Sequence, residues 1–62
     1  MIVIVKNMNC EHCVATIQKA LLRAGIIAKI NLDKKSVEFK TESETLRGRT
    51  AILDAGYIID NA

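Results

Sequence analysis

Aromatic residues are almost missing from this sequence, which has one Tyr, one Phe and no Trp among 62 residues. Proteins that bind single-stranded nucleic acid usually stack the bases on aromatic side chains within a positively charged groove. Here the nine Lys and Arg residues are scattered along the chain, and the formal net charge is only +2. Nucleic acid is therefore not an expected partner.

Long hydrophobic runs are missing as well. The most apolar stretch is the opening, residues 1–5, which ends at Lys6. It is too short for the core of a signal peptide and far too short for a membrane-spanning helix, which needs about 20 residues. We therefore expect no membrane insertion and a cytoplasmic location. In that reducing compartment, two cysteines are more often a metal-binding or catalytic pair than a structural disulfide.

Proline is absent, and only three residues are glycine. Half of the residues are hydrophobic and 26% are charged, a composition typical of a folded globular chain. Residues 1–62 fit a single domain whose core must be small. A deep substrate pocket would use side chains that this core needs, so we expect a surface binding site and not an enzyme.

The first half of the chain predicts a strand followed by a helix. Residues 1–6 are rich in β-branched residues and nearly all apolar, as in a central strand. From about residue 12 to residue 24, apolar side chains recur every three or four positions, which indicates one buried helix face. These are Val14, Ile17, Leu21 and Ala24. Gly25 then ends the helix.

The second half predicts a hairpin, a helix and a last strand. Residues 26–32 and 36–40 alternate between apolar and polar around a tight turn. Thr41 or Ser43 then provides the N-cap of a helix that runs to residue 55, and residues 57–59 form a short strand. The apolar residues expected to be buried by this helix are Leu46, Ile52 and Leu53.

This order of elements, strand-helix-strand-strand-helix-strand, indicates the α+β class. Both strand-helix-strand units should cross over right-handed, which places both helices on one face of a four-stranded antiparallel sheet. The result is a ferredoxin-like sandwich. Either Ile2 with Ile4, or Val3 with Val5, must line the uncovered face, and the sequence leaves both sets open because all four side chains are apolar.

Cys10 and Cys13 carry the chemistry of the sequence. Cys10 falls in a polar loop, and Cys13 falls in the first turn of the first helix. There the free amide groups and the positive end of the helix dipole favour a thiolate over a thiol. Two soft sulfur ligands suit a d¹⁰ ion such as copper(I). A structural zinc site would require further Cys or His residues at a matching spacing, which this sequence lacks.

Residues 8–13, Met-Asn-Cys-Glu-His-Cys, resemble the M-x-C-x-x-C loop of the heavy-metal-associated domain family. This family includes small copper chaperones and the amino-terminal domains of copper-transporting P-type ATPases. The resemblance spans residues 1–62, because the motif follows the first strand and the turn at residues 55–57 precedes the last. It implies a ferredoxin-like fold and one copper(I) ion bound by Cys10 and Cys13 and passed on by thiol exchange.

The resemblance also assigns roles to four neighbouring residues. Met8 matches a family Met that packs beneath the loop and is not a ligand. Tyr57 matches an aromatic residue that lies near the loop in bacterial members, although strand propensity alone would explain it. His12 is either a third ligand or, as we favour, an exposed bystander. Asn9 is neutral where zinc-exporting relatives often have an acid, which favours copper(I) over zinc.

Two positions depart from the family pattern. Asn7 stands where the family usually has Gly, and it can still adopt a left-handed turn conformation. Gly48 stands near a position where relatives have an apolar helix residue, and it should weaken the second helix by roughly 1 kcal/mol relative to Ala.

Other functions remain open at this stage. The chain could be an excised domain of a metal-transporting ATPase, or a carrier of mercury, zinc or cadmium. A thiol-disulfide redox protein is the enzymatic alternative. It is disfavoured because thioredoxin-like proteins are longer and place a cis-proline opposite their motif, whereas this sequence has no proline. The expected partner is a P-type ATPase or its metal-binding domains, and the expected state is a monomer or a metal-bridged homodimer.

Overall fold

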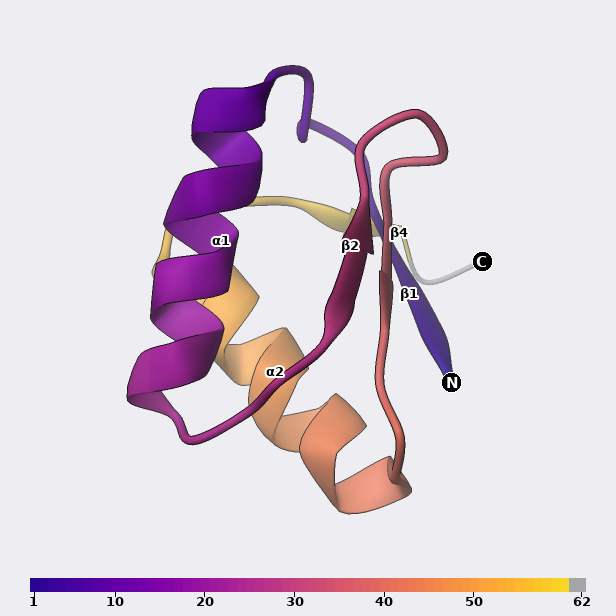
Figure 1. Ribbon diagram of the computed structural model, residues 1–62, viewed down its shortest axis with the longest axis vertical. Coiled ribbons are helices and arrows are strands. Elements are labelled where there is room, and N and C mark those ends of the chain that lie inside the picture. The colour runs from indigo at the N-terminus through magenta and orange to yellow at the C-terminus, as the bar shows by residue number, and fades with distance from the viewer. Residues whose placement is uncertain (61–62) are drawn as a thin grey trace.

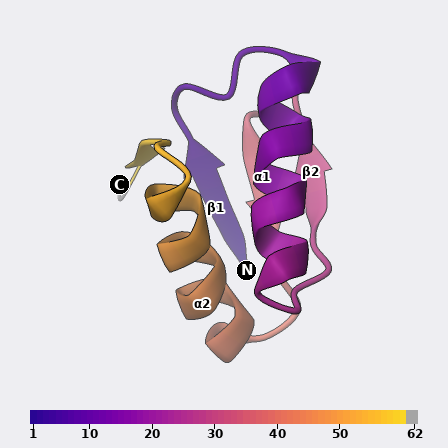
Figure 2. The ribbon, with the colours of Figure 1, turned by 90° about the vertical axis from the view of Figure 1, so that its left-hand side faces the viewer.

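The computed structural model describes residues 1–60 and contains the expected order of elements. Figure 1 shows them as β1 (Ile2–Val5), α1 (Glu11–Arg23), β2 (Lys29–Asn31), β3 (Ser36–Glu38), α2 (Glu42–Asp54) and β4 (Ile59–Asp60). The strands form one antiparallel four-stranded sheet in the order β2-β3-β1-β4. Both helices cover the same face of the sheet (Figure 2), so the predicted ferredoxin-like fold is confirmed.

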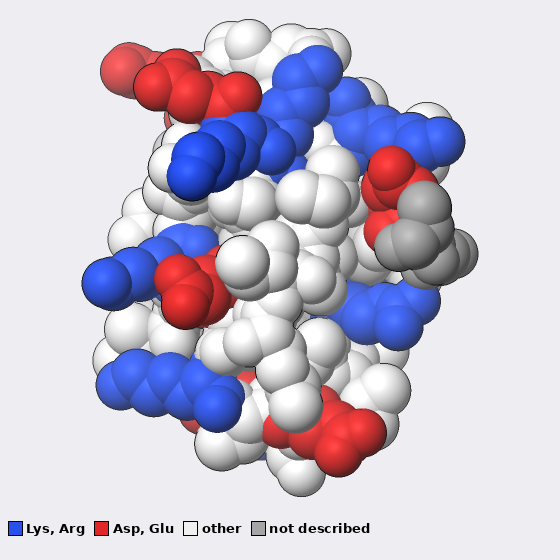
Figure 3. Space-filling view, turned by 90° about the vertical axis from the view of Figure 1, so that its right-hand side faces the viewer, with Lys and Arg blue, Asp and Glu red and all other residues white. Residues whose placement is uncertain are grey.

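The structure decides which face of β1 is covered. Val3 and Val5 are buried against the helices, with 6% and 0% of their surface exposed. Ile2 and Ile4 lie on the open face and are 64% and 36% exposed. Figure 3 shows this open face, where an uncharged strip separates groups of Lys and Arg side chains on either side.

Two strands are shorter or later in the chain than the sequence predicts. The last strand is Ile59–Asp60 instead of residues 57–59, because the amide of Tyr57 donates to the carbonyl of Ile52 at 3.3 Å and so closes the end of α2. The second strand begins at Lys29 instead of residue 26, because the amide of Ile26 donates to the carbonyl of Leu21 at 2.9 Å. In both places the chain caps a helix before it joins the sheet.

The start of α2 follows the predicted helix-start chemistry. Of the two candidate caps, Thr41 is the one used, because its hydroxyl accepts a hydrogen bond from the amide of Glu44 at 3.1 Å. Within residues 1–60, neither helix combines the length and apolar character needed to cross a membrane.

The predicted buried face of α2 is wrong for two of its three residues. Ile52 is fully buried, but Leu46 and Leu53 are 60% and 53% exposed. The buried position one turn before Ile52 is Gly48, and a Cβ atom there would overlap the ring of the buried Phe39. The helix therefore packs on the sheet through its glycine. Gly48 is required by this close approach, which reverses the expectation that it merely weakens the helix.

Candidate metal centre

The loop between β1 and α1 is anchored from below by Met8. The amide of Met8 donates to the carbonyl of Val5 at 3.3 Å, which forms a turn directly after the strand. The Met8 side chain is fully buried in the core. We call residues 7–10 the cysteine loop. Because Met8 points inward, the loop presents its next residues, Asn9 and Cys10, at the surface, where both are exposed.

Cys10 and Cys13 lie together at the amino-terminal end of α1. Cys10 is the N-cap residue, with extended backbone angles of φ −154° and ψ 169°, and Cys13 is in the first helical turn. The Cys10 thiol donates a hydrogen bond to Cys13 Sγ at 3.6 Å, and both cysteines are free thiols. Cys10 is exposed and Cys13 is half-buried. An incoming ion would therefore meet Cys10 first.

The surroundings of Cys13 favour its thiolate. A backbone hydrogen bond from Asn9 and side-chain hydrogen bonds from Tyr57 and Cys10 lower the pKa of the Cys13 thiol, in that order of importance. The same bond to Cys13 raises the pKa of the Tyr57 hydroxyl, because ionisation of Tyr57 would remove the donor. The thiolate is the form that binds metal. The lowered pKa therefore favours the metal-binding form of Cys13.

The geometry brings two free thiols together. Among residues 1–60, no group of three or more Cys, His, Asp or Glu side chains is placed to hold a metal ion. Tetrahedral coordination with metal–sulfur bonds of about 2.3 Å would place the sulfurs about 3.8 Å apart, and linear coordination about 4.6 Å. The observed 3.6 Å is close to the first value, and a modest outward movement of the exposed Cys10 reaches the second.

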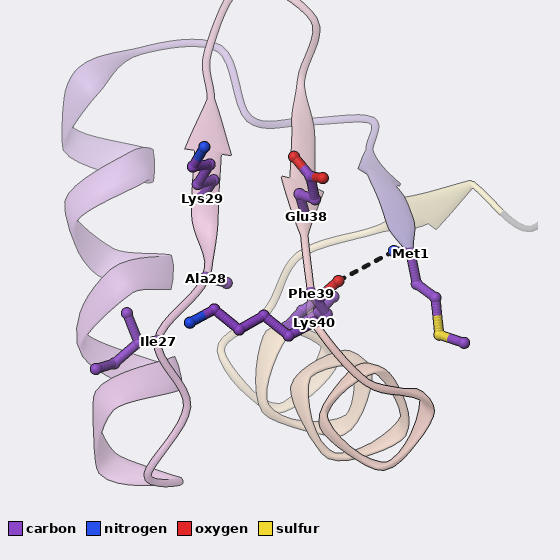
Figure 4. A pocket seen from close by; sticks show the side chains of 7 residues that line it. All are labelled: Met1, Ile27, Ala28, Lys29, Glu38, Phe39 and Lys40. Atoms are coloured by element: carbon purple, nitrogen blue, oxygen red, sulfur yellow. Dashed lines mark hydrogen bonds between the residues drawn. The ribbon is translucent and has the colours of Figure 1, made fainter.

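A hollow elsewhere in the molecule is unconnected with the cysteines. It is lined by Met1 together with residues 27–29 and 38–40, where β2 and β3 move apart at the end of the sheet opposite the cysteine loop (Figure 4). The ammonium group of Met1 donates to the carbonyl of Phe39 at 3.0 Å beside it. The thiols instead lie at the surface, at the amino-terminal end of α1.

The family model of the heavy-metal-associated domain matches residues 2–57 of the chain. The chain belongs to the heavy-metal-associated domain family. A curated relative, the COP-associated protein of Helicobacter felis, is 42% identical in an alignment of 57 residues, with 86% of this chain and 86% of that protein covered.

Solved structures of copper chaperones have the same fold. A trimeric form of the copper chaperone Atx1 from Synechocystis superposes with a TM-score of 0.80 at 27% identity, over 97% of this chain and 98% of that one. A second Atx1 structure, a side-to-side form obtained anaerobically, gives the same TM-score and coverage at 26% identity. The heavy-metal-associated domain of this chain is therefore similar in fold to copper-trafficking proteins over nearly its whole length.

The remaining candidate residues of the heavy-metal-associated domain lie in different surroundings. His12 is exposed on α1 between the two cysteines, and Asn9 is exposed in the cysteine loop. Tyr57 is half-buried, and its hydroxyl, from the far end of the chain, lowers the pKa of the Cys13 thiol. Of the four neighbours singled out in the sequence, Tyr57 is the one whose side chain acts on a cysteine sulfur.

The roles of two further residues near the site were not predicted from the sequence. An interaction with Thr16 partly offsets the raised pKa of the Tyr57 hydroxyl, and the Thr16 hydroxyl donates to the carbonyl of His12 at 3.0 Å. Thr16 lies three residues after Cys13, so helical spacing could have placed the two on one face. Asn7 accepts a hydrogen bond from the amide of Ile58 at 2.9 Å. No local pattern reports a contact between residues so far apart in the chain.

Proposed function

We propose that this protein is a copper(I) carrier that binds one ion between the thiolates of Cys10 and Cys13. The observation that carries the proposal is the pair of free thiols, 3.6 Å apart at the exposed end of α1, with the pKa of Cys13 lowered. Copper(I) is satisfied by two soft ligands, whereas zinc requires about four. The family, and the similarity to proteins named as copper chaperones, support the same ion.

The carrier acts by exchange of ligands and catalyses no reaction. A thiolate of the partner attacks the bound ion on the side of the exposed Cys10, which leaves first, while the half-buried Cys13 holds the ion until a second partner thiolate replaces it. We propose the metal-binding domains of a metal-transporting P-type ATPase as the partner and the cytoplasm as the place of transfer. Residues 1–62 act in this scheme as one heavy-metal-associated domain.

The exposed position of Cys10 also permits a shared ion. When no partner is present, a second copy of the chain can offer its own thiolates to the same copper(I), which gives a metal-bridged homodimer in equilibrium with the monomer. Size-exclusion chromatography with and without one equivalent of copper(I) measures this equilibrium. A dimer that forms equally well in the absence of copper(I) would contradict the bridging role of the metal.

Anaerobic titrations against a competing chelator test the choice of ion. We expect wild-type protein to bind one copper(I) far more tightly than it binds zinc or cadmium. Cys10→Ser and Cys13→Ser should each abolish tight binding while the circular dichroism spectrum stays unchanged, because the site lies on the surface. His12→Ala provides a matched control within the same loop and should retain tight binding. Wild-type affinity in either cysteine variant would refute the proposed site.

Transfer is tested separately from binding. Copper(I)-loaded protein is mixed with an isolated two-cysteine domain of a P-type ATPase, the two are separated by ion exchange, and the copper on each is measured. We expect the ion to be divided between the two proteins within the mixing time. Retention of copper(I) by the carrier, under conditions in which a small chelator removes it, would speak against a chaperone and for a storage or regulatory domain.

A further inference from the structure

The last pair of backbone hydrogen bonds between β1 and β4 is irregular. The register pairs Val5 with Ile59, and beyond it the amide of Lys6 donates to the carbonyl of Ile58 at 2.8 Å. In a regular antiparallel pair the amide of Ile58 would donate back to the carbonyl of Lys6. It donates instead to the side-chain oxygen Oδ1 of Asn7 at 2.9 Å.

Asn7 therefore replaces a main-chain acceptor with its side chain. The carbonyl of Lys6 is turned away and accepts from Nζ of Lys35 at 3.4 Å. The backbone of Asn7 does not adopt the left-handed conformation that the sequence allowed. Among the non-glycine residues that the structure describes, a positive φ occurs only at Lys35, with φ 53°. The family's usual Gly at position 7 would have no side chain to offer to Ile58.

The Asn7–Ile58 bond joins two segments that both belong to the metal site. Asn7 is the first residue of the cysteine loop, and Ile58 directly follows Tyr57, whose hydroxyl acts on the Cys13 thiol. On its other side, Tyr57 is held by the hydrogen bond that its backbone amide donates to the carbonyl of Ile52. Tyr57 thus lies between two fixed points, one on α2 and one on the cysteine loop.

We propose that Asn7 is a positioning residue of the metal site, whose bond to Ile58 holds the Tyr57 hydroxyl against Cys13. The proposal rests on the proposed function, in that the hydroxyl then stabilises the negative charge of a two-thiolate copper(I) site. Loss of the bond lets the segment at residues 57–58 move away from the loop. Copper(I) then leaves the site faster.

The first experiment needs no metal. Hydrogen exchange of the Ile58 amide, followed by NMR, should be faster in Asn7→Ala than in wild type and should recover in Asn7→Asp, whose carboxylate can accept the same bond. Since Tyr57 is the only Tyr and there is no Trp, tyrosine emission reports this residue alone. Acrylamide should quench that emission more in Asn7→Ala than in wild type or Asn7→Asp.

The second experiment follows the loss of copper(I) to a chelator in stopped flow. We expect Asn7→Ala to accelerate the loss by about three- to tenfold, the range for one hydrogen bond. Tyr57→Phe should accelerate it equally, Asn7→Ala should add nothing in the Tyr57→Phe background, and Asn7→Asp should restore the wild-type rate. A merely structural Asn7 would give independent, multiplying effects in the double variant.

The outcomes separate this proposal from the proposed function. Unchanged exchange of the Ile58 amide and unchanged quenching in Asn7→Ala would overturn the positioning role whatever the metal result. Multiplying effects of Asn7→Ala and Tyr57→Phe on copper(I) loss would overturn it too. If wild-type protein binds no copper(I), the proposed function fails, and the metal-free measurements still judge the contact between Asn7 and Ile58.

Discussion

The two cysteines differ although they belong to one motif. Cys13 is half-buried and accepts hydrogen bonds that stabilise its thiolate, whereas Cys10 is exposed at the N-cap and donates to Cys13. In an exchange reaction the ligand with fewer supporting contacts is released first. In the carrier role proposed above, the asymmetry gives the pair a direction, with Cys10 as the point of exchange and Cys13 as the ligand that is retained.

Tyr57→Phe should raise the pKa of the Cys13 thiol, because it removes one of the hydrogen bonds that lower it. At a pH below the thiol pKa, a higher pKa means less thiolate and slower alkylation. The rate of alkylation of Cys13 by iodoacetamide, measured against pH in a Cys10→Ser background, should thus have its midpoint at higher pH in Tyr57→Phe. A profile that overlays the parent would show that the hydroxyl does not stabilise the thiolate in solution.

His12→Ala should change the affinity for copper(I) by less than tenfold, which is about 1.4 kcal/mol. The reason is that His12 is exposed, and that the described residues place no third Cys, His, Asp or Glu with the two thiols. Competition titration at neutral pH measures the change, with Cys13→Ser as the reference for the loss of a ligand. A larger loss, restored by an added imidazole, would make His12 a third ligand.

At the scale of elements, the sequence predicts which helices and strands form. It predicts less well which side of each element is buried. The order of strands and helices follows from apolar spacing and caps, and all of it is confirmed. The orientation of β1 could not follow, because Ile2 and Ile4 alternate with two equally apolar valines. The buried face of α2 was misjudged because hydrophobicity points to Leu46 and Leu53, whereas the closest packing uses a residue without a side chain, Gly48.

Gly48→Ala should destabilise the fold, although alanine favours helices by about 1 kcal/mol over glycine. The new methyl group would overlap the ring of Phe39, which is only 2% exposed, so that the ring or the helix would have to shift. Overpacking of a tight core costs about 1–3 kcal/mol, which outweighs the gain in propensity. Urea denaturation followed by circular dichroism measures the free energy of unfolding.

Two variants serve as controls for this result. Thr50→Ala changes an exposed residue of the same helix and should leave the free energy of unfolding nearly unchanged. Phe39→Leu in the Gly48→Ala background removes part of the ring and should recover some of the lost stability. A stabilised Gly48→Ala protein would mean that α2 does not approach the ring of Phe39 as closely as described.

At the scale of the whole molecule, the site lies at one end of a small core. The buried residues extend from Met8 beneath the cysteine loop to Phe39 beside the opposite end of the sheet. The motif and its place in the element order were enough to predict that the two thiols lie together at the start of α1, and the family resemblance placed Tyr57 near the loop. The hydrogen bond from Ile58 to Asn7 was not predictable, because it depends on how the start of β4 meets the cysteine loop across the sheet.

A chain of 62 residues has modest stability, so a bound ion should change it strongly. Free copper(I) at about 1,000 times its dissociation constant stabilises a folded state that alone binds it by about 4 kcal/mol. In a domain of this size each kcal/mol raises the melting temperature by about 4–8 °C. Anaerobic thermal denaturation should therefore show an increase of tens of degrees on loading. The increase should vanish in Cys10→Ser and Cys13→Ser and persist in His12→Ala. An equal increase in the cysteine variants would mean that the ion stabilises the chain from another place.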